Sequence, residues 1–152
     1  MTSSSTATRT LADLTARTGL EVLDHLEREL TTPVTDGIQA QGDLIVIPFA
    51  LVEHAVTELS HGHYWHDVPT GGLELLRSAA GGNPHALVAD DRTCRWNRFI
   101  RDTTGLAIGM LEASAFAYLI HPEHGASAIA PGRYVIRRQR EHGRGQNHLV
   151  AD

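Results

Sequence analysis

The chain has 152 residues, a formal net charge of −5, 41% hydrophobic residues and a single cysteine. This length and composition are those of one globular domain with a buried core. The negative charge disfavours a nucleic-acid binder that relies on overall positive charge, and the lone Cys94 excludes an intramolecular disulfide framework and a cysteine-based zinc site.

The N-terminal segment is predicted to be helical. Leucines repeat at helical spacing between Thr10 and Leu30, and Thr18-Gly19-Leu20-Glu21 has the form of a capping box, in which the first side chain and the glutamate cap each other's backbone amides. We therefore expect a short helix or turn and then a firm helix from about Leu20 to Leu30. Pro33 and the glycines after it end this part, so residues 1–41 form a tail and helical segment.

Short apolar runs separated by glycine and proline predict strands in the rest of the chain. The run from Leu44 to Val52 indicates a buried strand, and Pro48 within it predicts an edge position or a bulge. Leu73 to Ala80 fits either a strand or a helical turn. Further strands are expected at Ala55 to Leu59, Ala86 to Val88, Trp96 to Ile100, Leu106 to Ile120, which Gly109 or Ser114 divides in two, and Arg133 to Arg140.

Alanine richness leaves a buried helix open for Leu106 to Ile120, but the whole pattern predicts a mainly β (α+β) fold. We expect a compact β-sandwich or barrel over residues 42–142, with an N-terminal helix and a C-terminal tail at 143–152. No segment reaches the roughly 20 apolar residues that span a bilayer, and the N-terminus lacks the apolar core of a secretory signal. A soluble, cytoplasmic protein is therefore expected.

Five of the ten histidines lie in two short motifs, Ser60-His61-Gly62-His63-Tyr64-Trp65-His66 and His121-Pro122-Glu123-His124. In a strand, the histidines of His-Gly-His would face the same way and could converge on one ion. The proline of the second motif predicts a turn or bulge, in which both histidines could face inward. Neutral imidazoles suit zinc, iron or manganese, and a carboxylate favours the harder ions.

These motifs predict a divalent-metal site whose ligands are His61, His63, His121 and His124. Glu123 would be a further ligand or the general base, because a bound water at an open metal position can have its pKa lowered to about 7. The other account is an exposed histidine-rich loop, since histidine is abundant throughout the chain. His54 and His85 are interpreted as ordinary surface or turn histidines.

A cluster of arginines near the C-terminus is the second candidate site. It would form a positive patch able to hold phosphate or carboxylate, or to dock a partner. Only Tyr134 is interleaved, so nucleic acid is disfavoured, and a charge-paired strand or a subunit contact is the alternative. We therefore expect a homo-oligomer or a protein partner. The arginines are Arg133, Arg137, Arg138, Arg140 and Arg144.

Two resemblances follow from these motifs. The paired histidines followed much later by another are similar to the metal site of cupin barrels, although cupins place a glutamate soon after the pair, where this chain has Asp67. The order of His-Gly-His, His-Pro-Glu-His-Gly and Pro-Gly-Arg-Tyr with Arg-Gln-Arg-Glu resembles a family of small bacterial β-proteins without a characterised activity. This resemblance covers roughly residues 42–141 and implies no catalytic residues.

Signatures of other chemistry are absent. A phosphate-binding loop with lysine is impossible because the chain has no lysine, and neither a Rossmann glycine fingerprint nor a Gly-x-Ser-x-Gly elbow occurs. Two functions are therefore predicted. The first is a small metal-binding β-barrel protein, which would be a metal-dependent enzyme of unknown reaction if Glu123 acts as base. The alternative is a non-enzymatic structural or interaction subunit that self-assembles or docks on a larger complex.

Overall fold

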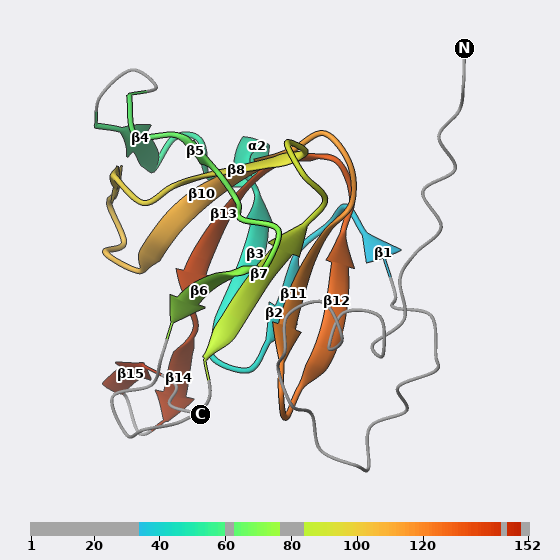
Figure 1. The fold of residues 1–152 in the computed structure, drawn as a ribbon. Helices are drawn as coiled ribbons and strands as arrows, with labels where there is room; N and C mark the ends of the chain where they lie inside the picture. Colours follow the sequence, from blue (N-terminus) through green and yellow to red (C-terminus); the bar gives the residue numbers. More distant parts are fainter. Residues whose placement is uncertain (1–33, 60–62, 77–83, 144–145, 150–152) are drawn as a thin grey trace.

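The computed structural model describes residues 34–59, 63–76, 84–143 and 146–149 (Figure 1). The predicted N-terminal helix and His61 lie outside these residues. Most of the described chain forms strands, and its one helix, α2, is the single turn Phe49–Val52. The prediction of a mainly β fold is confirmed.

Two sheets form the body of the protein. The five-stranded sheet has the order β1 (Val34–Thr35), β12 (Gly125–Ile129), β11 (Ala117–His121), β7 (His85–Ala89) and β6 (Leu73–Leu76). The six-stranded sheet has the order β2 (Gln39–Gln41), β3 (Leu44–Pro48), β13 (Gly132–Arg138), β10 (Ala107–Ala113), β8 (Cys94–Asn97) and β5 (His66–Asp67). Neighbouring strands are antiparallel except for the parallel pair β1 and β12.

Two small ribbons accompany these sheets. One pairs β4 (Val56–Glu58) with β9 (Ile100–Asp102), and the other pairs β14 (Arg140–Gly143) with β15 (Gln146–Leu149). In Figure 1 the first ribbon and α2 lie at one end of the molecule, and the second ribbon lies at the other end.

The main core lies between the two sheets. Leu87 and Leu119 from the five-stranded sheet and Leu44, Leu111 and Ile136 from the six-stranded sheet belong to one cluster and are almost fully buried. Alternation along each strand explains this, because every second side chain faces the other layer. The two layers are therefore sandwich-like, and no pairing among the described strands joins the sheets edge to edge, so the barrel prediction is wrong.

The opposite face of the six-stranded sheet is also covered. Ile47, Met110 and Val135 point to this side and pack with Val52 of α2 and Val56 of β4. This second cluster explains why Val52 is buried although only the first part of the apolar run from residue 44 to 52 is a strand. Leu51 of the same helical turn is 55% exposed.

Pro48 ends β3, which corrects the prediction of a strand from Leu44 to Val52. Its φ of −53° and ψ of 132° place it directly before the first residue of α2, and proline suits this position because it has no N–H to donate. The strand is neither at an edge nor bulged: β3 lies between β2 and β13, and its register runs without a shift.

The apolar stretch from Leu106 to Ile120 forms two strands, β10 and β11, and no buried helix. Ser114 lies in the bend between them, whereas Gly109 lies within β10 beside a register shift in its pairing with β13. Leu73–Leu76 is a strand, β6, which decides the alternative that the sequence left open. These strands position the two groups of side chains described next.

Candidate functional site

The second histidine motif lies where β11 turns into β12. His121 is completely buried at the end of β11, and His124 is exposed in the turn. His85 begins the adjacent strand β7, where Ile120 pairs with Ala86, so that His85 and His121 are cross-strand neighbours. The ring centroids are 4.5 Å apart for His85 and His121, 4.5 Å for His121 and His124, and 6.3 Å for His85 and His124.

His85 is not a surface or turn histidine, and that interpretation is corrected here. Only 1% of its surface is exposed. The sequence carried a signal for this, because His85 occupies the same alternating face as Leu87 and Ala89, both of which belong to the core between the sheets.

His85 and Gln41 connect the two sheets through polar contacts. The Nε2 atom of His85 lies 3.0 Å from the backbone oxygen of Gln41, and its Nδ1 atom lies 3.5 Å from the buried carboxylate of Asp43. The amide of Gln41 donates to the backbone oxygen of Leu119 at 3.0 Å and to Oγ of Ser127 at 2.9 Å. Buried polar groups need such partners, so this group ties β2 to the opposite sheet.

The predicted metal ligands are not gathered at one point by the described residues. His63 lies in the loop before β5 of the six-stranded sheet, whereas His85 and His121 lie on β7 and β11 of the five-stranded sheet and His124 follows β11. His121 accepts a hydrogen bond at Nδ1 from the backbone N–H of Glu123, at 3.1 Å. Among the residues that the structure describes, no three His, Cys, Asp or Glu side chains form a group that could hold a metal ion. Because His61 is outside them, the four-histidine site stays a prediction.

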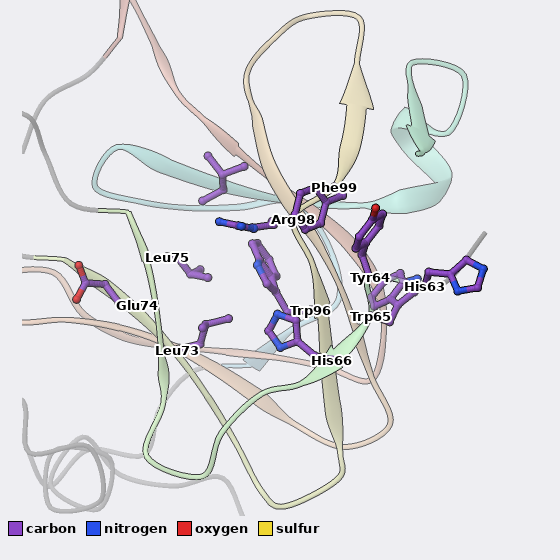
Figure 2. A pocket seen from close by; sticks show the side chains of 11 residues that line it. His63, Tyr64, Trp65, His66, Leu73, Glu74, Leu75, Trp96, Arg98 and Phe99 are labelled. Atoms are coloured by element: carbon purple, nitrogen blue, oxygen red, sulfur yellow. The ribbon is translucent and has the colours of Figure 1, made fainter. Parts of the chain in front are cut away.

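His63 instead lines a cleft of about 600 Å³ at the open side of the two layers. The cleft lies beside β6, the last described strand of one sheet, and beside β5 and β8 at the end of the other. Figure 2 shows side chains from both sheets around it. The lining residues are His63, Tyr64, Trp65, His66, Leu73, Glu74, Leu75, Trp96, Arg98, Phe99 and Ile108.

Aromatic rings dominate this lining. Both tryptophans of the chain are present, together with Tyr64 and Phe99, although Phe, Trp and Tyr make up only 5% of the sequence. The rings of Tyr64 and Phe99 are in contact, with centroids 4.2 Å apart, and the guanidinium carbon of Arg98 lies 4.8 Å from the Phe99 centroid. Tyr64 is 43% exposed and Phe99 37%, so these rings form an accessible wall.

The tryptophans are held in place from behind. Trp96 is only 5% exposed, and its ring lies against the backbone of Gly109. The indole N–H of Trp65 donates to the carboxylate of Glu58, and the guanidinium carbon of Arg95 lies 5.3 Å from a Trp65 ring centroid. A wall fixed in this way loses little conformational entropy when a ligand binds.

Two arginines of the predicted patch, Arg133 and Arg137, are paired with carboxylates. Arg133 shares Glu112 with Arg95, at 2.7 and 2.8 Å, and the two hydrogen bonds lower the pKa of Glu112. Arg137 pairs with Asp102 through Nε at 2.9 Å and Nη2 at 3.0 Å. Arg138 faces the other side of β13 and is half-buried, and the side chain of Arg140 lies outside the described part, as does Arg144.

Cys94 is not a reactive nucleophile. It is 1% exposed, and burial raises the pKa of its thiol to about 12. The thiolate, which is the nucleophilic form, is therefore not populated near neutral pH.

The protein is thus a two-layer β protein with an aromatic cleft at the open side of its layers. The chain belongs to the family whose model is described as a domain of unknown function, DUF8820, and which matches residues 40–139. No curated protein and no solved structure matches the chain. The matched residues contain the histidine group and the whole lining of the cleft. In the described part, no helix is long and apolar enough to cross a membrane.

Proposed function

We propose that this chain is a ligand-binding protein and that the aromatic cleft between β5 and β6 is its binding site. The observation that carries the proposal is the gathering of both tryptophans, Tyr64 and Phe99 around a cleft of about 600 Å³. Small-molecule sites are concave, of roughly 300 to 1,000 Å³, and lined mainly by apolar and aromatic side chains with a few polar groups.

The composition of the lining favours binding over a purely structural role. Leu73, Leu75 and Ile108 contribute an apolar base that is half-buried and packs on the core. Tyr64 and Phe99 keep a large part of their rings in water, although burial of an aromatic ring is favourable. A ligand that covers these rings gains the favourable free energy of burying them, because the fold itself leaves them exposed.

Intrinsic fluorescence gives a direct test, because the only two tryptophans of the chain both line the cleft. We expect the neutral probe N-phenylnaphthylamine to bind saturably, with energy transfer from tryptophan. Phe99→Ala should weaken this binding by about tenfold, the effect of losing on the order of 1.4 kcal/mol of ring contact.

The matched control is Ile38→Ala, because Ile38 is 56% exposed and does not line the cleft. It should leave the affinity for the probe unchanged. Equal weakening by both substitutions would overturn the assignment of the site to the cleft, and a wild-type protein that binds no aromatic compound, neutral or charged, would overturn the proposal.

As the second candidate function, we propose that the chain binds a divalent metal ion, which would be zinc, iron or manganese. The observation in its favour is the close grouping of the imidazoles of His85, His121 and His124. Imidazole nitrogens are suitable ligands for these ions. Ligation would require the rings to turn from the arrangement described above, because His121 Nδ1 already accepts a hydrogen bond.

Elemental analysis of untagged protein purified without chelator tests this candidate. We expect one ion per chain, lost in His121→Ala and kept in the control His54→Ala, whose residue is exposed. Loss in His61→Ala as well would assign the ion to the two motifs together, whereas retention there would assign it to the group around His85. Wild-type protein that carries no ion, and takes none up on dialysis against zinc, iron or manganese, rules the candidate out.

A further inference from the structure

Unlike four other arginines of the chain, Arg98 has no carboxylate partner among the residues that the structure describes. Arg92, Arg95, Arg133 and Arg137 each lie within 4.0 Å of an aspartate or glutamate. Among the residues that the structure describes, no carboxylate pairs with Arg98, and its contact is with the face of Phe99. A permanent positive charge is therefore available on the wall of the cleft.

The lining holds one carboxylate that could compensate this charge, and it is directed elsewhere. Figure 2 shows the side chain of Glu74 pointing away from the space between Leu75, Trp96 and Arg98. Glu58, the acid next to the cleft, is engaged by the indole N–H of Trp65. Arg98 is itself exposed, so water screens an ion pair at this position, and an anion gains most there when two of its oxygens meet the planar guanidinium.

The guanidinium and the rings also lie in a useful relative position. Arg98 lies against the face of Phe99, which in turn contacts Tyr64. Trp96 lines the same cleft as Arg98. A flat ligand lying on these rings would bring a substituent of its own into reach of the guanidinium, whose planar fork matches the two oxygens of a carboxylate or phosphate.

We propose that the cleft selects a small aromatic compound that carries an oxyanion, with its ring on the aromatic wall and its anionic group on Arg98. This inference rests on the proposed function and names the ligand class of the same site. The shared chemistry is a planar ring with a carboxylate or phosphate, and both an aromatic acid and a mononucleotide have it.

Isothermal titration calorimetry with matched compounds tests the selection. Naphthylacetate, naphthylacetamide and naphthylmethylamine share one ring system and are anionic, neutral and cationic. We expect naphthylacetate to bind at least about tenfold more tightly than the amide, since a charge-assisted hydrogen bond is about twice as strong as a neutral one, and the amine to bind most weakly. Adenosine monophosphate compared with adenosine measures the phosphate case separately.

Substitution of the arginine then assigns the preference to its cause. In Arg98→Gln the affinity for naphthylacetate relative to that for naphthylacetamide should fall to about one. Arg98→Lys should keep part of this preference because a point charge remains. Arg101→Gln is the matched control, because Arg101 is exposed on β9 and lies outside the lining. It should keep the wild-type ratio. Circular dichroism checks that each variant is folded.

The outcomes separate this inference from the proposed function. If N-phenylnaphthylamine binds the wild-type protein but anionic and neutral compounds bind equally, the selection for an oxyanion is wrong and the ligand-binding function stands. A preference that survives in Arg98→Gln also overturns the inference. If neither the neutral probe nor any compound of the two series binds, the proposed function itself is wrong. The inference is supported, with phosphate as the anion, if adenosine monophosphate is preferred over adenosine by a larger factor in affinity than naphthylacetate is preferred over naphthylacetamide.

Discussion

At the scale of single residues, Gly109 decides where the Trp96 ring can lie. A Cβ atom on Gly109 would be 2.1 Å from Cζ2 and 2.5 Å from Cη2 of Trp96. No such contact is sterically allowed, so the large ring occupies the space that the glycine leaves. The floor of the cleft therefore depends on a residue that does not line it.

Gly109→Ala should destabilise the protein by about 1 to 3 kcal/mol, because an added methyl group in a packed region forces the ring and the neighbouring backbone to move. Urea unfolding measures the loss, and a shift of the tryptophan emission spectrum reports the displaced ring. Gly71→Ala is the control, since nothing lies within 4 Å of a Cβ there. Equal stability of the two variants would show that Trp96 can reorient at no cost.

At the scale of elements, Asp102 joins several strands that the sequence separates. It lies at the end of β9 and pairs with Arg137 of β13, and its carboxylate also accepts hydrogen bonds from Thr104 and from the backbone N–H of Ala107 in β10. Its side chain is 3% exposed and that of Arg137 is 14%. Burial alone would raise the pKa of Asp102, but the hydrogen bonds from Thr104 and Arg137 outweigh it and lower this pKa.

Asp102→Asn should lower the free energy of unfolding by about 3 kcal/mol at neutral pH, because it leaves the guanidinium of Arg137 buried without its counter-ion. The lowered pKa fixes the sign of the pH dependence. The contribution of Asp102 is complete above its unfolded pKa of about 3.9 and is lost as pH falls through the lower folded value. Urea unfolding between neutral and acid pH should show this loss in the wild-type protein and a smaller one in the variant.

Asp91→Asn provides the control for this pair. Asp91 and Arg92 are 3.8 Å apart and their side chains are 76% and 84% exposed, and exposed pairs contribute little because water screens them. Comparable destabilisation by the two substitutions would mean that burial of the Asp102 pair has no special weight.

At the scale of the whole molecule, the two sheets are connected by polar side chains at one position and leave a cleft between them at another. Gln41 and His85 connect the sheets by hydrogen bonds at the end of the core. Beside β5 and β6, the last described strands of the two sheets, no strand pairing closes the gap and the aromatic cleft lies there. The same failure to close that excludes a barrel therefore creates the candidate binding site.

The sequence by itself determined the mainly β character and most strand positions, because alternation and turn residues are local signals. Arg133 to Arg140 alternates and forms β13 up to Arg138, and Ser114 separates β10 from β11. Local sequence signals gave wrong predictions at positions whose structure is determined by tertiary contacts. Pro48 was expected to mark an edge or bulge, yet it ends an inner strand, and His85 was expected at the surface although it caps the core.

Only the tertiary structure decided which distant residues meet. Strand order brings His85 beside His121, and the open side of the layers gathers Tyr64, Leu73, Trp96 and Ile108 from separate segments. The two histidine motifs supply only part of each group, and the remaining members come from distant segments. Strand pairing and register depend on contacts between residues far apart in the chain, which no local periodicity encodes. The histidine motifs are therefore visible in the sequence, whereas the aromatic cleft can be recognised only from the arrangement of the two sheets.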